Sequence, residues 1–339
     1  MGERRRTTAP PNTGGGPRWT PGRSRQGTRG FPAVPTSTTT TRREPMMTAT
    51  QDVDRAAPAG PSFEDRVRRV ADAAHRMRHH VLNMGEVQGQ GYVGQALGVA
   101  DVLAVAYQDQ LRLRPADPHW DERDRFLLSI GHYAIALYAA LAEAGVIPVE
   151  ELETYGSDES RLPMSGMASY TPGMEISGGS LGHGLGVGVG MALGLRHRGV
   201  ASRVVNLLSD GELDEGSTWE AAMGAAHHRL GNLTAVVDMN ALQADGPTAG
   251  VLAIEPVERK WEAFGWHTVR VDGNDVPALL RAFDSLAEAD ADTPRVVICD
   301  TRIGSGVPLL ETREKAHFMR IDEHEWQIAR DQLDQGAQR

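Results

Sequence analysis

Runs of consecutive apolar residues alternate with amphipathic segments through most of the chain, beginning near residue 62. The apolar runs predict strands at 125–129, 203–208, 233–238, 267–273 and 295–301. The amphipathic segments predict helices at 62–82, 96–111, 133–145, 216–229, 256–264 and 276–289. Apolar strands that alternate with helices are typical of a parallel sheet buried on both faces. We therefore expect an α/β fold with a doubly wound, mostly parallel sheet and helices on both faces.

Three segments depart from this alternation. The glycine-rich stretch 181–198, "LGHGLGVGVGMALGLRHR", predicts a buried helix, and each glycine costs it about 1 kcal/mol relative to alanine. Its backbone must therefore approach a neighbouring helix or a cofactor closely. No predicted strand precedes its G-x-G-x-x-G-like spacing, so the spacing does not indicate a dinucleotide site. Residues 85–94, "GEVQGQGYVG", and the Pro-, Gly- and Ser-containing residues 145–180 predict loops.

Residues 1–60 are rich in Pro, Gly, Thr and Arg and predict a disordered basic segment. Residues 1–45 carry nine Arg and two Glu, a net charge of +7. A transit peptide or a polyanion-binding arm would fit this composition. We favour translation from Met46 or Met47, because 33 Arg against two Lys indicates a GC-rich genome with Arg-rich upstream frames. The folded domain is expected at 61–325, followed by a polar C-terminal tail at 326–339.

The composition of the remaining chain excludes several classes of protein. With the basic segment removed, the net charge is about −17, which argues against a nucleic-acid-binding surface. No window reaches the roughly 18 apolar residues of a membrane helix, so we expect a cytoplasmic protein without a membrane span. The single cysteine, Cys299, lies in a predicted strand and is expected to be a buried, inert thiol.

Polar residues follow two successive predicted strands. Asp210 comes directly after 203–208, and Asn240 follows 233–238, one βαβ unit further along the chain. Ligands of such sheets bind beyond the carboxyl ends of the strands, and carboxylate and amide oxygens are ligands that Mg2+ prefers. Gly211 would let a phosphate approach the backbone near a helix N-terminus. Taken alone, Asp210 is equally explained as a helix N-cap and Asn240 as a turn residue. Together, at a spacing of one βαβ unit, they predict a magnesium and phosphate site.

The stretch "SDGELDEGSTWEAAMGAAHHRLGNLTAVVDMNALQADGPT" resembles the thiamine diphosphate motif of transketolases, in the split form whose N-terminal half is a separate subunit. The resemblance covers about residues 65–325 and includes "RFLLSIGHYAIALYAAL", "TPGMEISGGSLGHGLGVGVGMALG", "FGWHTVRVDGND" and "RIGSGV". It implies that Mg2+ is bound by the side chains of Asp210 and Asn240 and by the carbonyl of Leu242. It also implies cofactor contacts from a larger set of residues: His132, Gly179, Leu181, Gly211, Glu212, Asn240 and His317.

Within that set, the resemblance places His132, Gly211 and His317 at the diphosphate, and Gly179 and Leu181 near the two rings of the cofactor. It implies catalytic roles for His132, Glu215 and Glu220. The two glutamates match acidic residues that lie between subunits of the family and link two active sites through protons. A solvated helix start is the alternative explanation for both glutamates.

The chain departs from the family pattern at three positions. Ser209 replaces the first glycine of Gly-Asp-Gly, a change between small residues that keeps the metal ligand. Tyr92 and Ser165, or Gly166 if the alignment slips by one, replace histidines that handle the hydroxyl groups of the sugar donor in the family. The resemblance therefore implies an intact cofactor site but an altered donor.

The implied activity is the transfer of a two-carbon unit to an aldehyde acceptor, from a ketose or from a 2-oxoacid such as pyruvate. The family requires a second, pyrimidine-binding domain, which would be a separate C-terminal subunit in an α2β2 heterotetramer. Two alternatives are a non-catalytic paralogue and a 2-oxoacid-using acyl transferase or dehydrogenase alpha subunit.

Overall fold

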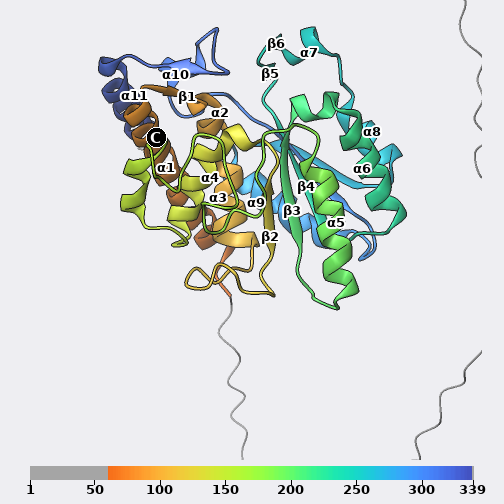
Figure 1. Ribbon diagram of the computed structural model, residues 1–339. Helices are drawn as coiled ribbons and strands as arrows, with labels where there is room; N and C mark the ends of the chain where they lie inside the picture. Colours follow the sequence, from red (N-terminus) through yellow and green to blue (C-terminus); the bar gives the residue numbers. More distant parts are fainter. Residues whose placement is uncertain (1–59, 338–339) are drawn as a thin grey trace, which may run out of the picture. The chain divides into compact units, whose positions relative to one another are not determined.

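A computed structural model describes residues 60–337. The predictions about the basic N-terminal segment fall outside this range, apart from residue 60. The main sheet has five strands in the order β2-β3-β4-β8-β7, and every neighbouring pair is parallel (Figure 1). The strands are β2 (Arg125–Leu128), β3 (Val204–Ser209), β4 (Leu233–Met239), β7 (His267–Asp272) and β8 (Arg295–Asp300). All five predicted strands and the predicted parallel α/β sheet are confirmed.

The described range contains these α-helices: α1 (Phe63–Gln88), α2 (Val93–Gly98), α3 (Ala100–Val105), α4 (Ala134–Glu143), α5 (Gly184–His197), α6 (Gly216–His227), α7 (Thr248–Val251), α8 (Val257–Ala263), α9 (Val276–Ser285), α10 (Pro308–Glu311) and α11 (Glu323–Ala337). Two short antiparallel pairs complete the strands: β1 (Gln90–Gly91) with β9 (Met319–Arg320), and β5 (Leu242–Gln243) with β6 (Gly246–Pro247). None of these helices is long and apolar enough to cross a membrane.

Helices cover both faces of the sheet, with α5, α6 and α8 on one face and α1, α3, α4 and α9 on the other (Figure 1). Along β8, Val296 and Ile298 join the core on the first face, whereas Val297 and Cys299 join the core on the second. Successive side chains of a strand point to opposite faces, so burial on both faces requires the continuous apolar runs seen in the sequence. Cys299 is fully buried, as expected.

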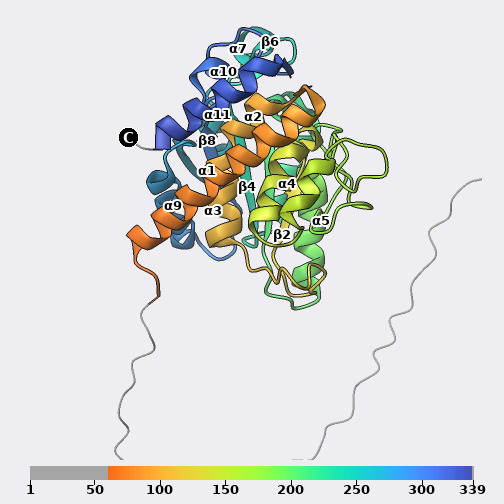
Figure 2. The same cartoon turned by 90° about the vertical axis from the view of Figure 1, so that its left-hand side faces the viewer.

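The C-terminal segment corrects the expected domain boundary. Residues 326–337, predicted to be a polar tail, form most of α11, which lies along α1 (Figures 1 and 2). Trp326, Ala329 and Leu333 recur at helical spacing and lie in the core. The alternating polar residues conceal this narrow apolar stripe, so the fold extends to the end of the described chain.

The first two helices also differ from the prediction. The first continues to Gln88 and ends at Gly89, whose φ of 65° permits the left-handed cap. Residues 85–94 are therefore only partly a loop, because α1, β1 and α2 take most of them. The second predicted helix divides into α2, α3 and a π-helical turn at Ala106–Gln110.

Helix α5 is buried on one side only. A side chain at Gly184 would collide with Ser129, and one at Gly188 would touch Leu233 at 3.4 Å, as close packing predicts. By contrast, Gly186, Gly190 and Gly194 are exposed, and a Cβ on them would meet nothing within 4 Å. Their backbone therefore presents a flat glycine surface to the outside, so close packing explains Gly184 and Gly188 but not these three glycines.

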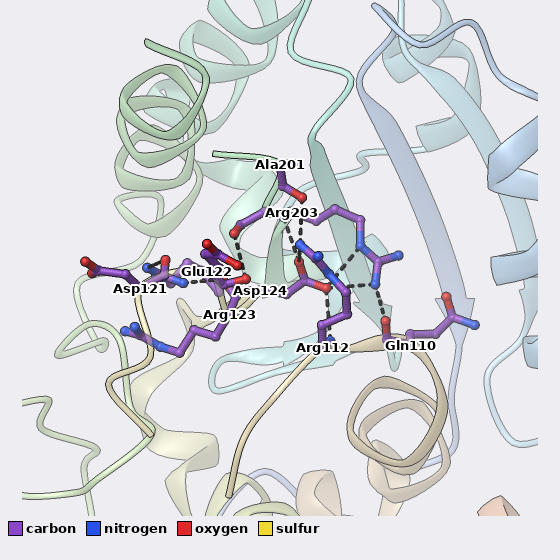
Figure 3. A network of polar contacts seen from close by, with 10 residues as sticks. Gln110, Arg112, Asp121, Glu122, Arg123, Asp124, Ala201 and Arg203 are labelled. Carbon is purple, nitrogen blue, oxygen red and sulfur yellow. Dashed lines mark hydrogen bonds and ion pairs between the residues drawn. The ribbon is translucent and has the colours of Figure 1, made fainter. Parts of the chain in front are cut away.

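The amino ends of β2 and β3 are joined by Asp124, which is completely buried (Figure 3). Its carboxylate accepts hydrogen bonds from the backbone N–H of Arg203 at 2.8 Å and of Arg112 at 3.0 Å, and from the Arg203 guanidinium at 2.8 Å. Burial alone would raise the pKa of Asp124, but these donors outweigh it and lower the pKa. This edge of the sheet is thus held by a fully paired carboxylate.

Candidate cofactor site

The carboxyl ends of β3 and β4 carry the predicted ligands. Ser209 pairs in register with Asp238, so the residues that follow each strand begin at the same edge of the sheet. A cavity of about 250 Å3 opens there. It is lined by several residues that the sequence singled out: His132, Leu181, Asp210, Gly211, Glu215, Leu242 and His317.

Asp210 begins a 3-10 turn at Asp210–Asp214 and is only 1% exposed. Its Oδ1 accepts the N–H of Gly211 at 2.9 Å, and its Oδ2 accepts the hydroxyl of Thr248. Burial, assisted by the negative charge of Asp238, nevertheless raises the pKa of Asp210 to about 7. A buried carboxylate with this pKa lacks a compensating positive charge, which a bound cation would supply.

Asn240 is oriented by a buried network. Asp238, 1% exposed, accepts hydrogen bonds from the Tyr133 hydroxyl at 2.8 Å, from Asn240 Nδ2 at 2.8 Å and from Thr301. Asn240 Nδ2 also donates to the Tyr133 oxygen at 2.9 Å, which uses both amide hydrogens. The amide oxygen therefore faces the other way, where it accepts the N–H of Leu242 at 3.0 Å and keeps one lone pair free.

The donor chemistry of this edge fits Mg2+. A carboxylate from Asp210, an amide oxygen from Asn240 and a backbone carbonyl from Leu242 are all hard oxygen donors. In addition, Oδ1 of Asp214 is buried without a hydrogen-bond partner. These unsatisfied oxygens and the raised pKa of Asp210 are expected features of a cation site.

His132 and His317 face the same cavity, with ring centroids 5.7 Å apart. Burial and the neighbouring His317 lower the pKa of His132 to about 4, and burial also lowers the pKa of His317. Nδ1 of His317 is buried and has no partner. Two neutral imidazoles, one with an unused ring nitrogen, provide hydrogen-bonding groups for a polar ligand such as a diphosphate.

Four predicted residues lie outside the lining of the cavity, namely Asn240, Glu212, Gly179 and Glu220. Glu212 is 1% exposed and joins two loops by accepting hydrogen bonds from the hydroxyl of Ser129 and from the N–H of Gly182, which lies 2.8 Å away. Its second oxygen has no partner, and burial raises its pKa to about 7. Gly179 has a φ of 124° and donates to the carbonyl of Ser129, whereas Glu220 lies on the exposed side of α6.

Tyr92 completes the aromatic wall beside the cavity. Its ring centroid lies 4.6 Å from that of His132, 5.6 Å from His317 and 5.2 Å from the exposed Phe318. Gly166, next to Ser165, donates its N–H to the carbonyl of Gly131 at 3.1 Å. The structure thus brings both positions at which a family histidine is replaced next to His132.

Sequence reasoning missed the groups behind the ligands, namely Ser129, Tyr133, Asp238 and Thr248. Asp238 was the detectable one, because a carboxylate inside an otherwise apolar strand requires compensation. Tyr133 and Thr248 carry no local signal, since each acts only through a partner that is distant in the sequence.

A larger cavity, about 670 Å3, lies at the opposite edge of the sheet, among the segments that precede β3, β4 and β8. Arg196, Arg203, Arg229 and Arg295 line it. None of the predicted ligands lies there, so chemistry rather than size selects the smaller cavity as the cofactor site.

Comparison with known families and proteins agrees with this geometry. Residues 69–338 match the family model described as transketolase, thiamine diphosphate binding domain. An uncharacterised transketolase family protein of Sinorhizobium fredii is 62% identical over 266 residues, which is 78% of this chain and 95% of that protein. A 6-deoxy-6-sulfo-D-fructose transketolase subunit of Clostridium sp. is 38% identical over 241 residues, 71% of this chain and 87% of that subunit.

An apulose-4-phosphate transketolase subunit of Actinobacillus succinogenes is 37% identical over 260 residues, 77% of this chain and 93% of that subunit. Among solved structures, the transketolase of Campylobacter jejuni matches with a TM-score of 0.72 and 27% identity, over 80% of this chain and 43% of that one. The chain therefore spans less than half the length of the solved transketolase. On the motif, the fold and these matches together, the chain belongs to the transketolase family and contains its thiamine diphosphate-binding domain.

Proposed function

We propose that this chain is the N-terminal, cofactor-binding subunit of a split transketolase-like enzyme that depends on thiamine diphosphate and Mg2+. The enzyme transfers a two-carbon unit to an aldehyde acceptor. The observation that carries the proposal is the convergence of Asp210, Asn240 and Leu242 at one edge of the sheet, beside the neutral rings of His132 and His317.

In this proposal, Asp210, Asn240 and the Leu242 carbonyl hold the magnesium ion. Gly211, His132 and His317 contact the diphosphate, while Gly179 and Leu181 approach the cofactor rings. When bound, thiamine diphosphate supplies a nucleophilic carbon centre that allows a carbon–carbon bond next to a carbonyl to be broken and re-formed. Glu212 positions the loop at Gly182 rather than contacting the cofactor.

The chain's own residues also shape the site electrostatically. Because burial keeps the pKa of His132 near 4, its ring is neutral and hydrogen-bonds without adding charge. Asp238 and Tyr133 hold the Asn240 amide so that one lone pair of its oxygen stays free for the metal. The ring of Tyr92 packs on His132 at the cavity, with Phe318 against its own edge, and this apolar group would limit the access of water to the reacting atoms.

The need for a separate pyrimidine-binding subunit is supported by two observations. Relatives of similar length are named transketolase subunits, whereas solved transketolases are more than twice as long as the matched region. The glycine surface of α5 (Gly186, Gly190 and Gly194) is exposed and adjoins α6, whose Met223 is 50% exposed. An exposed apolar surface of this kind favours a protein partner.

We propose an α2β2 assembly in which this surface and the start of α6 meet other subunits. Glu215 lines the cavity at the N-cap of α6, and Glu220 lies five residues further along, on the exposed side of that helix. Both are therefore in reach of an interface near the cofactor. In that arrangement they link two active sites through protons, as the resemblance to the family implies.

The donor is proposed to differ from an ordinary ketose phosphate. Tyr92 and Ser165 stand where the family carries hydroxyl-binding histidines, and Tyr92 packs directly on His132. Related subunits are named for 6-deoxy-6-sulfo-D-fructose and apulose 4-phosphate, so substrates vary among the relatives. Ketose and 2-oxoacid donors are separated by assaying both with the assembled complex, and acylation of a lipoyl acceptor would identify a dehydrogenase instead.

The test compares Asp210→Asn with Asp158→Asn, an exposed carboxylate in a distant loop. Both variants are purified with the partner subunit, and Mg2+-dependent binding of thiamine diphosphate is measured by calorimetry. We expect Asp210→Asn to abolish binding and activity while Asp158→Asn retains both. Equal binding by the two variants would place the metal elsewhere, and binding without turnover of any donor would support a non-catalytic paralogue.

A further inference from the structure

A second group of metal-ligating side chains lies outside the cofactor site, between α1 and α11. His75 and His79 are one helical turn apart on α1, so they share a face of that helix. Their ring centroids are 4.8 Å apart in an edge-to-face arrangement. Asp334 of α11 reaches them from the adjacent helix, with Oδ1 at 2.8 Å from His79 Nε2 and 3.5 Å from His75 Nε2.

The packing of the two helices explains why these residues meet. Figure 2 shows α11 lying along α1, and the contacts establish that the helices run antiparallel. Trp326 lies against Gly85, Arg330 pairs with Glu86 at 2.7 Å, and Asp334, one turn further, reaches His79. The buried Trp326 thus sets a register that places the carboxylate opposite the two imidazoles.

The distances agree with a shared metal ion. With bonds of about 2.0–2.1 Å to nitrogen and oxygen, the ligand atoms of a tetrahedral zinc site lie about 3.3 Å apart. The three ligand atoms here all lie within 4.8 Å of one another. The two nitrogen-to-oxygen distances bracket the ideal value, so small side-chain rotations suffice to close the site.

The alternative is an ordinary surface ion pair between His79 and Asp334. Such a pair explains their contact at 2.8 Å, but it leaves His75 beside the same oxygen at 3.5 Å without a good hydrogen bond of its own. A metal ion would use all three groups at once. The side chains are 31%, 26% and 56% exposed, so an ion would have direct access and water would complete its coordination.

We propose that His75, His79 and Asp334 form a binding site for a transition-metal ion of the Zn2+ class, separate from the magnesium site. Imidazole ligands favour zinc, copper and nickel, whereas the oxygen ligands near Asp210 favour magnesium. The ion fastens α11 to α1.

The position of this metal site relates it to the cofactor cavity. Helix α1 leads into β1 and Tyr92, while His317 and Phe318 lead through β9 into α11. Strands β1 and β9 pair with each other, with Gly91 opposite Met319. The metal site therefore joins α1 and α11, and the segments at the other ends of these helices carry the aromatic residues beside the cofactor cavity.

The test uses the full chain without a polyhistidine tag, in complex with its partner, with excess Mg2+ and thiamine diphosphate. Zinc chloride is titrated by calorimetry, and Co2+ is added separately to record its visible absorption. The variants are His79→Gln and Asp334→Asn, and the control is His324→Gln, an exposed histidine of α11 outside the cluster. Circular dichroism without zinc checks that each variant is folded.

We expect one zinc ion per chain in the wild-type protein and in His324→Gln. In His79→Gln and Asp334→Asn, the affinity falls by at least about 100-fold, because losing a direct ligand exceeds the 10–100-fold cost of losing an outer-shell partner. Zinc should also raise the Tm of the wild type but not of these two variants. Equal zinc affinity in all four proteins, or no binding by the wild type, would overturn the proposal.

Discussion

Replacing Tyr133 with Phe tests whether the buried network behind the cofactor cavity positions Asn240. The tyrosine is 1% exposed, and its hydroxyl donates to Asp238 and accepts from Asn240. The substitution keeps the ring and removes only the oxygen. Tyr138→Phe is the matched control, because Tyr138 is also fully buried and its hydroxyl donates to the carbonyl of Pro163 at 2.8 Å, away from the site.

The expected losses of stability and of metal affinity follow from the groups that each tyrosine hydroxyl contacts. Loss of a hydrogen bond to a charged group costs about 1.5–3 kcal/mol, so Tyr133→Phe should lower the free energy of unfolding by about that amount. Loss of the neutral bond in Tyr138→Phe should cost about 0.5–1.5 kcal/mol. Only Tyr133→Phe frees the Asn240 amide to rotate, and an outer-shell loss of this kind lowers metal affinity by about 10–100-fold.

Urea unfolding of the metal-free chain measures the loss in the free energy of unfolding. Titration of the partner complex with Mg2+ at saturating thiamine diphosphate measures the loss of metal affinity. Equal Mg2+ affinity in Tyr133→Phe and Tyr138→Phe would show that Asn240 is positioned without the network, even if the stabilities differ as expected.

Three further predictions concern the fold and the substrate. Asp124→Asn should lower the free energy of unfolding by about 1.5–3 kcal/mol at neutral pH, because it removes the buried charge that accepts hydrogen bonds from Arg203 and Arg112, whereas the exposed Asp121→Asn should have little effect. The pKa of Asp124 is lowered in the folded state, so its contribution to stability is present above the unfolded pKa near 3.8 and is lost as pH falls through the folded pKa. Denaturant unfolding at a series of pH values should therefore show the stabilities of the wild type and of Asp124→Asn converging in acid. Trp326→Ala should cost about 3–5 kcal/mol in urea unfolding, and a cost below about 1 kcal/mol would mean that α11 is not part of the core. Tyr92→His should raise kcat/KM for ketose phosphate donors about tenfold, which corresponds to the gain of one hydrogen bond. An unchanged kcat/KM would show that Tyr92 does not determine which donor is used.

The sheet was predictable because its strands are apolar on both faces, and the ends of β3 and β4 were predictable because Asp210 and Asn240 interrupt that pattern. The core stripe of α11 was not predicted, since Trp326, Ala329 and Leu333 are separated mostly by polar and charged residues and each is weak evidence alone. Likewise, Thr248 reaches Asp210 from a short helix 38 positions away. Contacts of that kind depend on how the loops fold over the sheet, which local periodicity does not encode.

Two buried aspartates at opposite edges of the same sheet differ in their electrostatic surroundings, and the difference supports the proposed cation site. Asp124 and Asp210 are both at most 1% exposed, yet the pKa of Asp124 is lowered, whereas that of Asp210 is raised to about 7. The difference lies in their partners, because Asp124 faces two arginines and their N–H groups, whereas Asp210 faces Thr248, Gly211 and another carboxylate, Asp238. A fold selected for stability alone would not bury two carboxylates together without a positive charge. The missing charge at this edge is therefore the strongest structural argument that Asp210 works with a bound cation.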